Sequence, residues 1–207
     1  MTLIKNLQSV KSQLPQDVCL VAVSKTKPKA MIQELWDAGQ LDFGENKVQE
    51  LVEKHEALPK GIRWHMIGHL QRNKVKYIAS FVHLIHGVDS ERLLKEIDKR
   101  AAQNNRVIDV LLQAHIAQES SKFGFDLEDL EAKLIREFYE QYSNVRIKGL
   151  MGMASLTEDE GQIKREFSSL NERFLSLKKE FPDMDILSMG MSGDYPLAID
   201  CGSNMVR

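Results

Sequence analysis

The sequence predicts an α/β fold, a TIM (β/α)₈ barrel that forms a single domain over residues 1–207 with an extra N-terminal helix. Short apolar runs alternate with stretches of helical spacing along the chain, which is typical of parallel strands joined by crossover helices. There are eight such runs, whereas a doubly wound open sheet usually has about five or six strands. A length of roughly 200 residues is also the lower size limit of the barrel. These three observations favour the barrel.

The predicted strands are the eight apolar runs, at residues 19–24, 41–44, 63–68, 81–86, 107–114, 145–151, 185–189 and 197–201. The predicted helices lie at residues 29–38, 47–57, 74–79, 90–103, 127–142 and 159–179, with a short turn near 192–195. An amphipathic helix over residues 1–14 is expected outside the barrel, over the opening between the first and last strands. Because the chain stops just after the eighth predicted strand, either this helix takes the place of an eighth barrel helix or a C-terminal segment is missing.

The composition excludes several classes of partner. Twenty-eight Lys and Arg residues against thirty Asp and Glu leave a net charge of −2, so no overall basic field would hold a nucleic acid or an anionic membrane. No apolar run approaches the roughly 18 residues of a membrane span, and the N-terminal helix lacks the apolar core of a signal peptide. We therefore expect a cytoplasmic protein. Cys19 and Cys201 lie far apart in apolar segments, which predicts reduced core residues rather than a disulfide or a zinc site.

The loops that follow the strands build the site of a TIM barrel, which draws attention to Lys25. Lys25 is the first residue after the apolar run VAVS, so its stem would lie among barrel side chains and its amine at the barrel mouth. Partial burial would make the neutral amine available for a Schiff base. The alternative is that Lys25 and Lys27 are both solvated loop lysines.

The polar residues near the next strands are less specific. Asn46 follows the second predicted strand, where it caps the next helix or bonds a ligand oxygen, and capping is the commoner use. His65 lies within an apolar strand and lacks partners at metal-ligand spacing. His83 and His86 are three residues apart, which places them on opposite faces of one strand. The sequence therefore predicts no metal site.

Small residues follow the last two predicted strands, at Ser188 to Ser192 (SMGMS) and at Gly202, Ser203 and Asn204. These are the loops in which a TIM barrel binds phosphate, because their backbone amides supply partial positive charge. Ordinary Gly-Ser turns are the alternative.

Arg207 ends the chain close to this proposed phosphate site. A permanently charged donor beside a pyridine ring would keep the ring nitrogen unprotonated and weaken the ring as an electron sink.

Seven blocks of the chain, in this order, resemble one family. They are residues 21–28 (VAVSKTKP), 43–50 (FGENKVQE), 64–74 (WHMIGHLQRNK), 121–125 (SKFGF), 149–154 (GLMGMA), 187–192 (LSMGMS) and 198–207 (AIDCGSNMVR). The chain resembles the pyridoxal-phosphate homeostasis proteins (YggS/PROSC-like), and the resemblance runs from about residue 5 to the end.

The resemblance implies a single-domain TIM barrel similar to the N-terminal domain of alanine racemase, with pyridoxal 5'-phosphate (PLP) held as a Schiff base. It assigns these cofactor-binding residues: Lys25 as the Schiff-base lysine, Asn46 lining the cofactor, Ser188, Gly202 and Ser203 in the phosphate turns, and Arg207 near the pyridine nitrogen. Three departures stand out. His115 replaces a usual Asn, Gly87 replaces a usual Ser, and the family continues past the arginine into an apolar stretch and a final helix.

The resemblance also implies a function, intracellular PLP homeostasis, in which the protein buffers the cofactor and delivers it to PLP-dependent acceptor enzymes. We expect no catalytic residues, because two-base racemisation in this superfamily needs a second acid-base group from a further domain. A low-activity PLP-dependent amino-acid racemase is the alternative, and a sugar-phosphate barrel without PLP is a third hypothesis. We expect a monomer with no nucleic-acid or membrane partner.

Overall fold

The centre of the fold is a barrel of parallel strands, which form a ring. The computed structural model describes residues 2–118 and 123–207. Within this part of the chain the strands pair in the order β1-β10-β9-β8-β6-β5-β4-β3-β2, and every pair is parallel. Because β1 (Cys19–Leu20) and β2 (Ala22–Val23) are separated only by Val21, the two ends of this order meet and the ring closes. The barrel prediction is confirmed.

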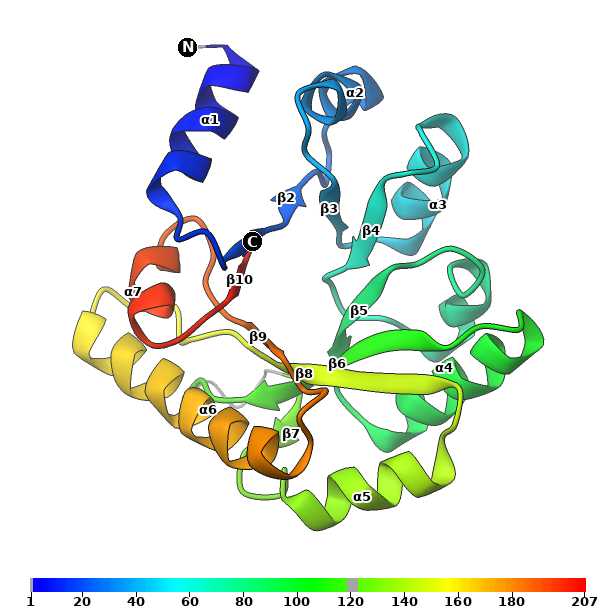
Figure 1. The fold of residues 1–207 in the computed structure, drawn as a ribbon, viewed down its shortest axis with the longest axis vertical. Coiled ribbons are helices and arrows are strands. Elements are labelled where there is room, and N and C mark those ends of the chain that lie inside the picture. The colour runs from blue at the N-terminus through cyan, green and yellow to red at the C-terminus, as the bar shows by residue number, and fades with distance from the viewer. Residues whose placement is uncertain (1, 119–122) are drawn as a thin grey trace.

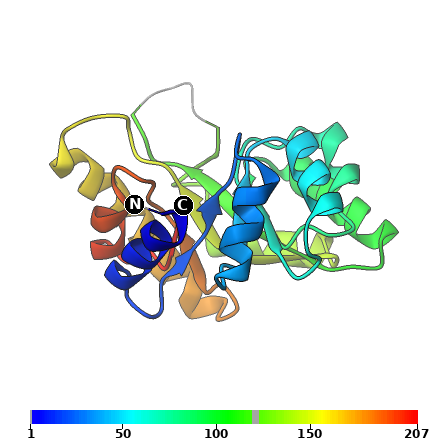
Figure 2. The ribbon, with the colours of Figure 1, turned by 90° about the horizontal axis from the view of Figure 1, so that it is seen from above.

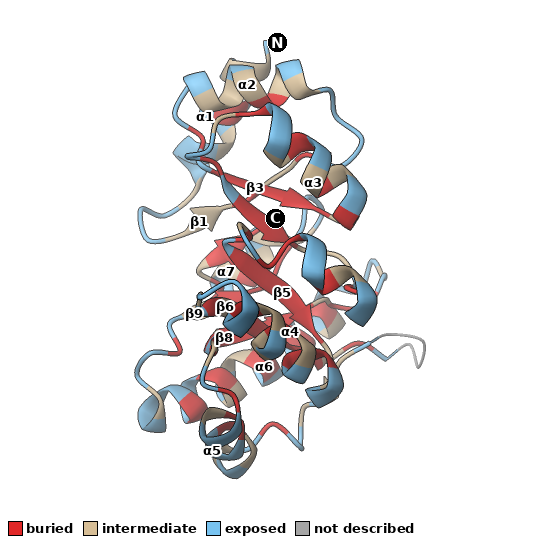
Figure 3. Cartoon of the chain, turned by 90° about the vertical axis from the view of Figure 1, so that its right-hand side faces the viewer, coloured by how far each residue is buried: buried red, intermediate tan, exposed pale blue. Residues whose placement is uncertain are grey.

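The remaining strands are β3 (Asp42–Glu45), β4 (Arg63–Met66), β5 (Leu84–Val88), β6 (Ile108–His115), β7 (Phe125–Asp126), β8 (Val145–Gly152), β9 (Ile186–Ser188) and β10 (Met205–Val206). The short β7 is not part of the ring and pairs with the end of β6. The helices surround the strands in Figure 1 and are α1 (Leu3–Gln13), α2 (Lys29–Asp37), α3 (Val48–Ala57), the 3₁₀ helix η1 (Arg72–Tyr77), α4 (Glu91–Gln103), α5 (Ala132–Gln141), α6 (Glu160–Glu180) and α7 (Tyr195–Asp200). Figure 3 shows buried strands inside helices whose outward faces are exposed.

The last predicted strand is wrong. Residues 197–200 belong to helix α7 and Cys201 directly follows it, and the eighth position in the ring is taken by the two-residue strand β10. Pro196 lies in the first turn of α7, where its missing N–H leaves no hydrogen bond unmade. The strand predicted at residues 81–86 is also displaced, because residues 78–82 form a turn and β5 begins only at Leu84. His83 therefore precedes the strand on which it was expected.

Helix α1 lies outside the ring, beside the pair of strands that closes it, as predicted. Its side chains Leu3, Leu7 and Val10 face β1, β2 and the end of β10 across a cavity. Figures 1 and 2 both place α1 next to α7, and Tyr195 Oη donates to Gln13 Oε1 at 3.2 Å. The N-terminal helix thus covers the wall where the first and last strands meet.

The cysteines differ from the sequence prediction in their burial. Cys19 in β1 and Cys201 at the end of α7 are free thiols, and both are half-buried rather than in the core. Each lies at an edge of the packed interior, because β1 starts the barrel wall and α7 ends at Cys201. No helix in the described residues has the length and apolar character needed to cross a membrane.

Candidate functional site

A cavity of about 550 Å³ lies at the carboxyl ends of the strands. Its lining comes from the segments that follow β2, β3, β4, β6, β9 and β10, including Lys25, Asn46, Gly68, His69, Gln113, Met191, Ser192, Gly193 and Arg207. Cofactor sites in proteins typically have volumes of about 300–1,000 Å³. Three of the predicted cofactor residues, Lys25, Asn46 and Arg207, therefore meet at one cavity of suitable size.

Lys25 is carried by a tight turn that a buried network holds in place. The turn closes with a hydrogen bond from Lys27 N to Ser24 O at 3.0 Å, and Thr26 has φ of 63°. Lys54 Nζ donates to Ser24 O at 2.7 Å, and Thr26 N donates to Glu50 Oε1 at 2.6 Å. Lys25 itself is exposed, so the expected partial burial is wrong. Because these hydrogen bonds fix the backbone of the turn, they place the base of the Lys25 side chain at the cavity.

The network below the turn centres on the buried pair Lys54 and Glu45. Lys54 Nζ lies 2.7 Å from Glu45 Oε1 and 2.6 Å from Glu50 Oε1, and Ser24 Oγ donates to Glu45 Oε1 at 2.6 Å. Burial raises the pKa of Glu45, and the hydrogen bonds from Lys54 and Ser24 oppose that shift. The second oxygen, Glu45 Oε2, is buried without a hydrogen-bond partner in the described residues. Burying this ion pair removes two charges from water, which costs free energy. We infer that the pair serves to position the loop.

Arg207 forms the opposite wall. Its backbone N donates to Gly190 O at 3.1 Å, and Nη1 donates to Ser188 Oγ at 2.8 Å. Burial lowers the pKa of Arg207 to about 10, which the charge of Asp194 partly opposes, so the side chain remains a cation at neutral pH. Nη2 is buried and has no partner among the described residues. An acceptor atom in the cavity, such as a pyridine nitrogen, would satisfy that orphaned donor.

A column of polar side chains runs from Arg207 through the barrel interior. Ser188 Oγ lies 3.2 Å from His86 Nδ1, His86 Nε2 lies 2.9 Å from His65 Nδ1, and His65 Nε2 lies 3.0 Å from Asp42 Oδ1. Burial lowers the pKa of both histidines, so both are neutral at pH 7. All of these contacts are satisfied in one arrangement of protons. In it Arg207 donates to Ser188, Ser188 donates to His86, His86 donates to His65 and His65 donates to Asp42. This column fixes the position of Ser188 and, through it, that of the arginine.

The other predicted phosphate residues lie behind the cavity and are not part of its lining in the described chain. Ser203 is buried, and its Oγ bonds the backbone of Leu187, Met189 and Met205, which joins β9 to β10. Gly202 has φ of 97°, and a Cβ there would lie 2.8 Å from Asn171 Nδ2. The small residues that do line the cavity are Ser192 and Gly193, in the loop between β9 and α7.

The lining also includes Gly68 and His69, at the end of the third predicted strand, and Gln113 and Phe123, which sequence reasoning did not single out. His69 Nδ1 lies 3.0 Å from Asp89 Oδ2, and the His69 ring stacks on Phe123 with centroids 4.2 Å apart. The signal that could have found Gln113 is a polar residue near the end of the apolar run VIDVLLQA.

The structure places the sequence departures around this site. A Cβ on Gly87 would lie 3.1 Å from Gly68 O and 3.3 Å from Gln113 Oε1, so a side chain there would press on two residues that line the cavity. His115 ends β6 and does not contribute to the described lining. Residues 121 and 122 of the SKFGF block lie outside the described residues.

The chain also matches known proteins over nearly its whole length. A family model described as the alanine racemase N-terminal domain matches residues 2–207. A pyridoxal phosphate homeostasis protein from Aquifex aeolicus is 40% identical, with 91% of this chain and 82% of the relative covered. The chain belongs to the pyridoxal phosphate homeostasis protein family. A member from Escherichia coli strain K12 is 36% identical, with 93% of this chain and 83% of the relative covered.

Solved structures agree with this family. PipY of Synechococcus elongatus, in its structure without PLP, has a TM-score of 0.93 and 35% identity, covering 100% of this chain and 97% of that chain. The structure of PipY with PLP bound has a TM-score of 0.88 and 36% identity over the same shares. An alanine racemase from Clostridium difficile has a TM-score of 0.79 at 14% identity, covering 99% of this chain and 54% of that chain, and so shares the fold.

Proposed function

We propose that this chain binds PLP in the cavity at the carboxyl ends of the strands and takes part in PLP homeostasis by holding and releasing the cofactor. The observation that carries the proposal is the meeting of Lys25, Asn46 and the orphaned donor of Arg207 at one cavity. The names of the homeostasis relatives and the structure of PipY with PLP bound support the same cofactor. Bound PLP supplies an aldehyde that reacts with an amine and a ring that can accept electrons.

The residues around the cavity each have a part in holding this ligand. Lys25 provides the amine for the covalent link, and Asn46 provides polar contacts from the end of β3. Ser192 and Gly193 provide backbone amides and the Ser192 hydroxyl for the phosphate, whereas the Met191 amide already donates to Asp194 Oδ1. Ser188, Gly202 and Ser203 shape that loop and the arginine from behind, which is the role we assign to them.

Arg207 favours storage of the cofactor over catalysis. A permanent cation that donates to the pyridine nitrogen keeps this nitrogen unprotonated, and an unprotonated ring is a weaker electron sink. Carbanion chemistry on a bound amino acid is therefore disfavoured. We propose a non-catalytic carrier that acts as a cytoplasmic monomer and passes PLP to acceptor enzymes.

The second candidate is a weak amino-acid racemase, which His69 favours because it is a titratable side chain in the lining and is paired with Asp89. A chiral assay with L-alanine at high protein concentration and excess PLP separates the two functions. The carrier predicts no conversion to D-alanine above a protein-free control. Measurable conversion that is lost in His69→Gln would establish the racemase instead.

Uptake of PLP is tested by a visible absorbance titration of the purified chain. The wild type is expected to develop a bound-PLP band with one PLP per chain, and Lys25→Ala is expected to lose it. Lys27→Ala is the matched control, because Lys27 is exposed in the same turn but does not line the cavity. A wild type that shows no bound-PLP band after unbound PLP has been removed would refute the proposal and favour a sugar-phosphate barrel.

A further inference from the structure

A second group of chemically active side chains lies at the opposite end of the barrel. Asp42 begins β3, His65 lies in β4, and His83 directly precedes β5. One carboxylate oxygen and one ring nitrogen from each histidine lie within 4.8 Å of one another. Asp42 and His65 are buried, whereas His83 is exposed. Three neighbouring strands thus bring together an oxygen and two nitrogens that are far apart in the sequence.

The spacing of these atoms suits a small metal ion. Asp42 Oδ1 and His65 Nε2 are 3.0 Å apart. Ligands of tetrahedral zinc at bond lengths of about 2.0–2.1 Å are roughly 3.3 Å apart, so this pair has to separate by only about 0.3 Å. His83 completes the group with an exposed side chain whose ring centroid lies 5.3 Å from that of His65.

The contacts around the group resemble those that orient metal ligands. Metal binding at His65 Nε2 requires the proton of this ring on Nδ1. From there it would donate to His86 Nε2 at 2.9 Å and fix the ring, with the donors of the polar column reversed between His65 and Ser188. Arg63 Nε donates to Asp42 Oδ1 at 2.7 Å and holds the carboxylate in place. The positive charge of Arg63 opposes the binding of a cation, and we therefore expect weaker binding than at a zinc site with four protein ligands.

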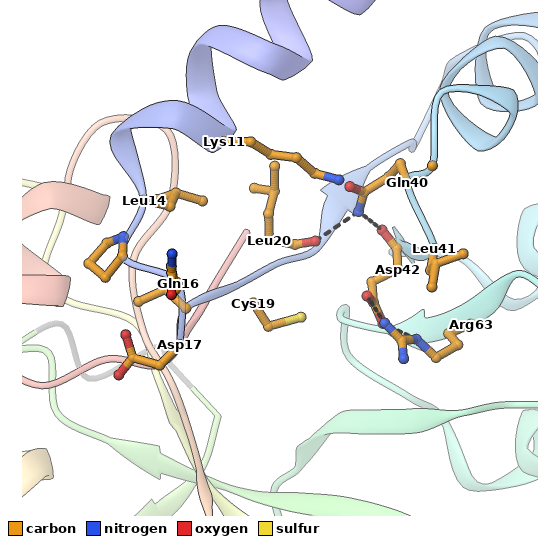
Figure 4. Close-up of a pocket in the computed structure, with 13 residues that line it drawn as sticks. Lys11, Leu14, Gln16, Asp17, Cys19, Leu20, Gln40, Leu41, Asp42 and Arg63 are labelled. Carbon is orange, nitrogen blue, oxygen red and sulfur yellow. Dashed lines mark hydrogen bonds and ion pairs between the residues drawn. The ribbon is translucent and has the colours of Figure 1, made fainter.

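A cavity of about 480 Å³ opens beside Asp42 and gives access from solvent. Figure 4 shows Cys19, Gln40, Asp42 and Arg63 on its walls, with the Cys19 sulfur directed toward Asp42 and Arg63. The thiol lies outside the three-residue group. Asp42 is the one residue of the three in the lining of this cavity, and a metal ion with three protein ligands has a fourth position for water.

We propose that Asp42, His65 and His83 form a binding site for one divalent transition-metal ion of the zinc or cobalt type at the amino-terminal end of the barrel. Two imidazoles and one carboxylate suit these ions, whereas magnesium and calcium prefer oxygen ligands. The site is separate from the cofactor cavity, because the strands place the two at opposite ends of the barrel.

Cobalt(II) titration of the full chain tests the proposal, with visible d–d absorption and metal analysis after dialysis as the two readouts. The wild type is expected to bind one cobalt ion with a tetrahedral spectrum. His83→Gln is expected to weaken binding at least ten-fold, and its PLP uptake should be unchanged because His83 is exposed and lies away from the cofactor cavity. His55→Gln is the matched control, because His55 lies in α3 outside the three-residue group, and it should bind like the wild type.

Three results would overturn the proposal. The first is a wild type that binds no cobalt after dialysis, and the second is equal weakening by His83→Gln and His55→Gln, which would indicate general surface binding. The third is a sulfur-to-cobalt charge-transfer band that disappears in Cys19→Ser, because the ligand set would then be a different one. Asp42→Asn provides a second ligand variant and should also weaken binding.

Discussion

Replacement of Lys54 by Met should show how strongly the buried network supports the loop that carries Lys25. The variant removes the cationic partner of Glu45 Oε1 and the donor to Ser24 O, at 2.7 Å each, and leaves Ser24 Oγ as the remaining donor to Glu45 Oε1. Glu45 is fully buried, so it cannot recover hydration and must instead take up a proton. Protonating a carboxyl of ordinary pKa 4.5 at pH 7 costs about 3 kcal/mol, and the lost bond to Ser24 O adds about 1 kcal/mol.

We therefore expect Lys54→Met to lower the free energy of unfolding by about 4 kcal/mol at pH 7, measured by urea denaturation of the PLP-free chain. The sign of the pH dependence follows from Glu45. Its folded pKa lies further above the unfolded value in the variant, so the variant gains stability relative to the wild type as the pH falls toward 4.5. At pH 5.5 the free energy of unfolding of the variant should be about 2 kcal/mol below that of the wild type.

Two controls accompany this experiment. Lys29→Met breaks the exposed ion pair with Glu53, at 2.8 Å, and should cost less than about 1 kcal/mol at either pH. Adding Glu45→Gln to Lys54→Met should abolish the pH dependence. A deficit below about 1 kcal/mol at pH 7, or one that is equal at both pH values, would refute the reasoning about the buried carboxylate.

Two further predictions concern backbone packing and thiol reactivity. Gly68→Ala should cost about 1–3 kcal/mol in urea denaturation, because its Cβ would lie 2.6 Å from Asn46 O, whereas Gly193→Ala should be near neutral, since nothing lies within 4 Å. An equal cost at both glycines would contradict this. Burial, with the charge of Asp42, raises the pKa of Cys19 to about 11 from 9.0, so at pH 8 its thiolate fraction should be about 100-fold below that of a free thiol. Alkylation kinetics in Cys201→Ser should show a correspondingly slow reaction that accelerates up to about pH 11, and a rate like that of a free thiol would refute the shift.

The number and order of the strands could be predicted from the sequence, except at the C-terminus. The run LAIDC at residues 197–201 has the length and composition of a strand, and periodicity over five residues cannot distinguish a strand from one turn of helix. The true last strand, β10, has only two residues and gives no periodic signal. Its place is set by pairing with β1 and β9, which are remote in the sequence.

The candidate site was predictable where residues follow strand ends. Lys25, Asn46 and Arg207 fit that rule and the family motifs, and they line one cavity. The network below Lys25 was not predictable, because Lys54 reaches it from a helix. The group formed by Asp42, His65 and His83 was missed for a similar reason: the register of neighbouring strands, rather than sequence spacing, brings its ligand atoms together.

The most direct test of the account is to identify the residue that carries the cofactor. The purified chain is incubated with PLP, reduced with borohydride and digested, and the modified peptide is located by mass spectrometry. The visible band is expected to bleach, and one phosphopyridoxyl group should be found on Lys25. Modification spread over several exposed lysines, or an equal yield of adduct in Lys25→Ala, would contradict it.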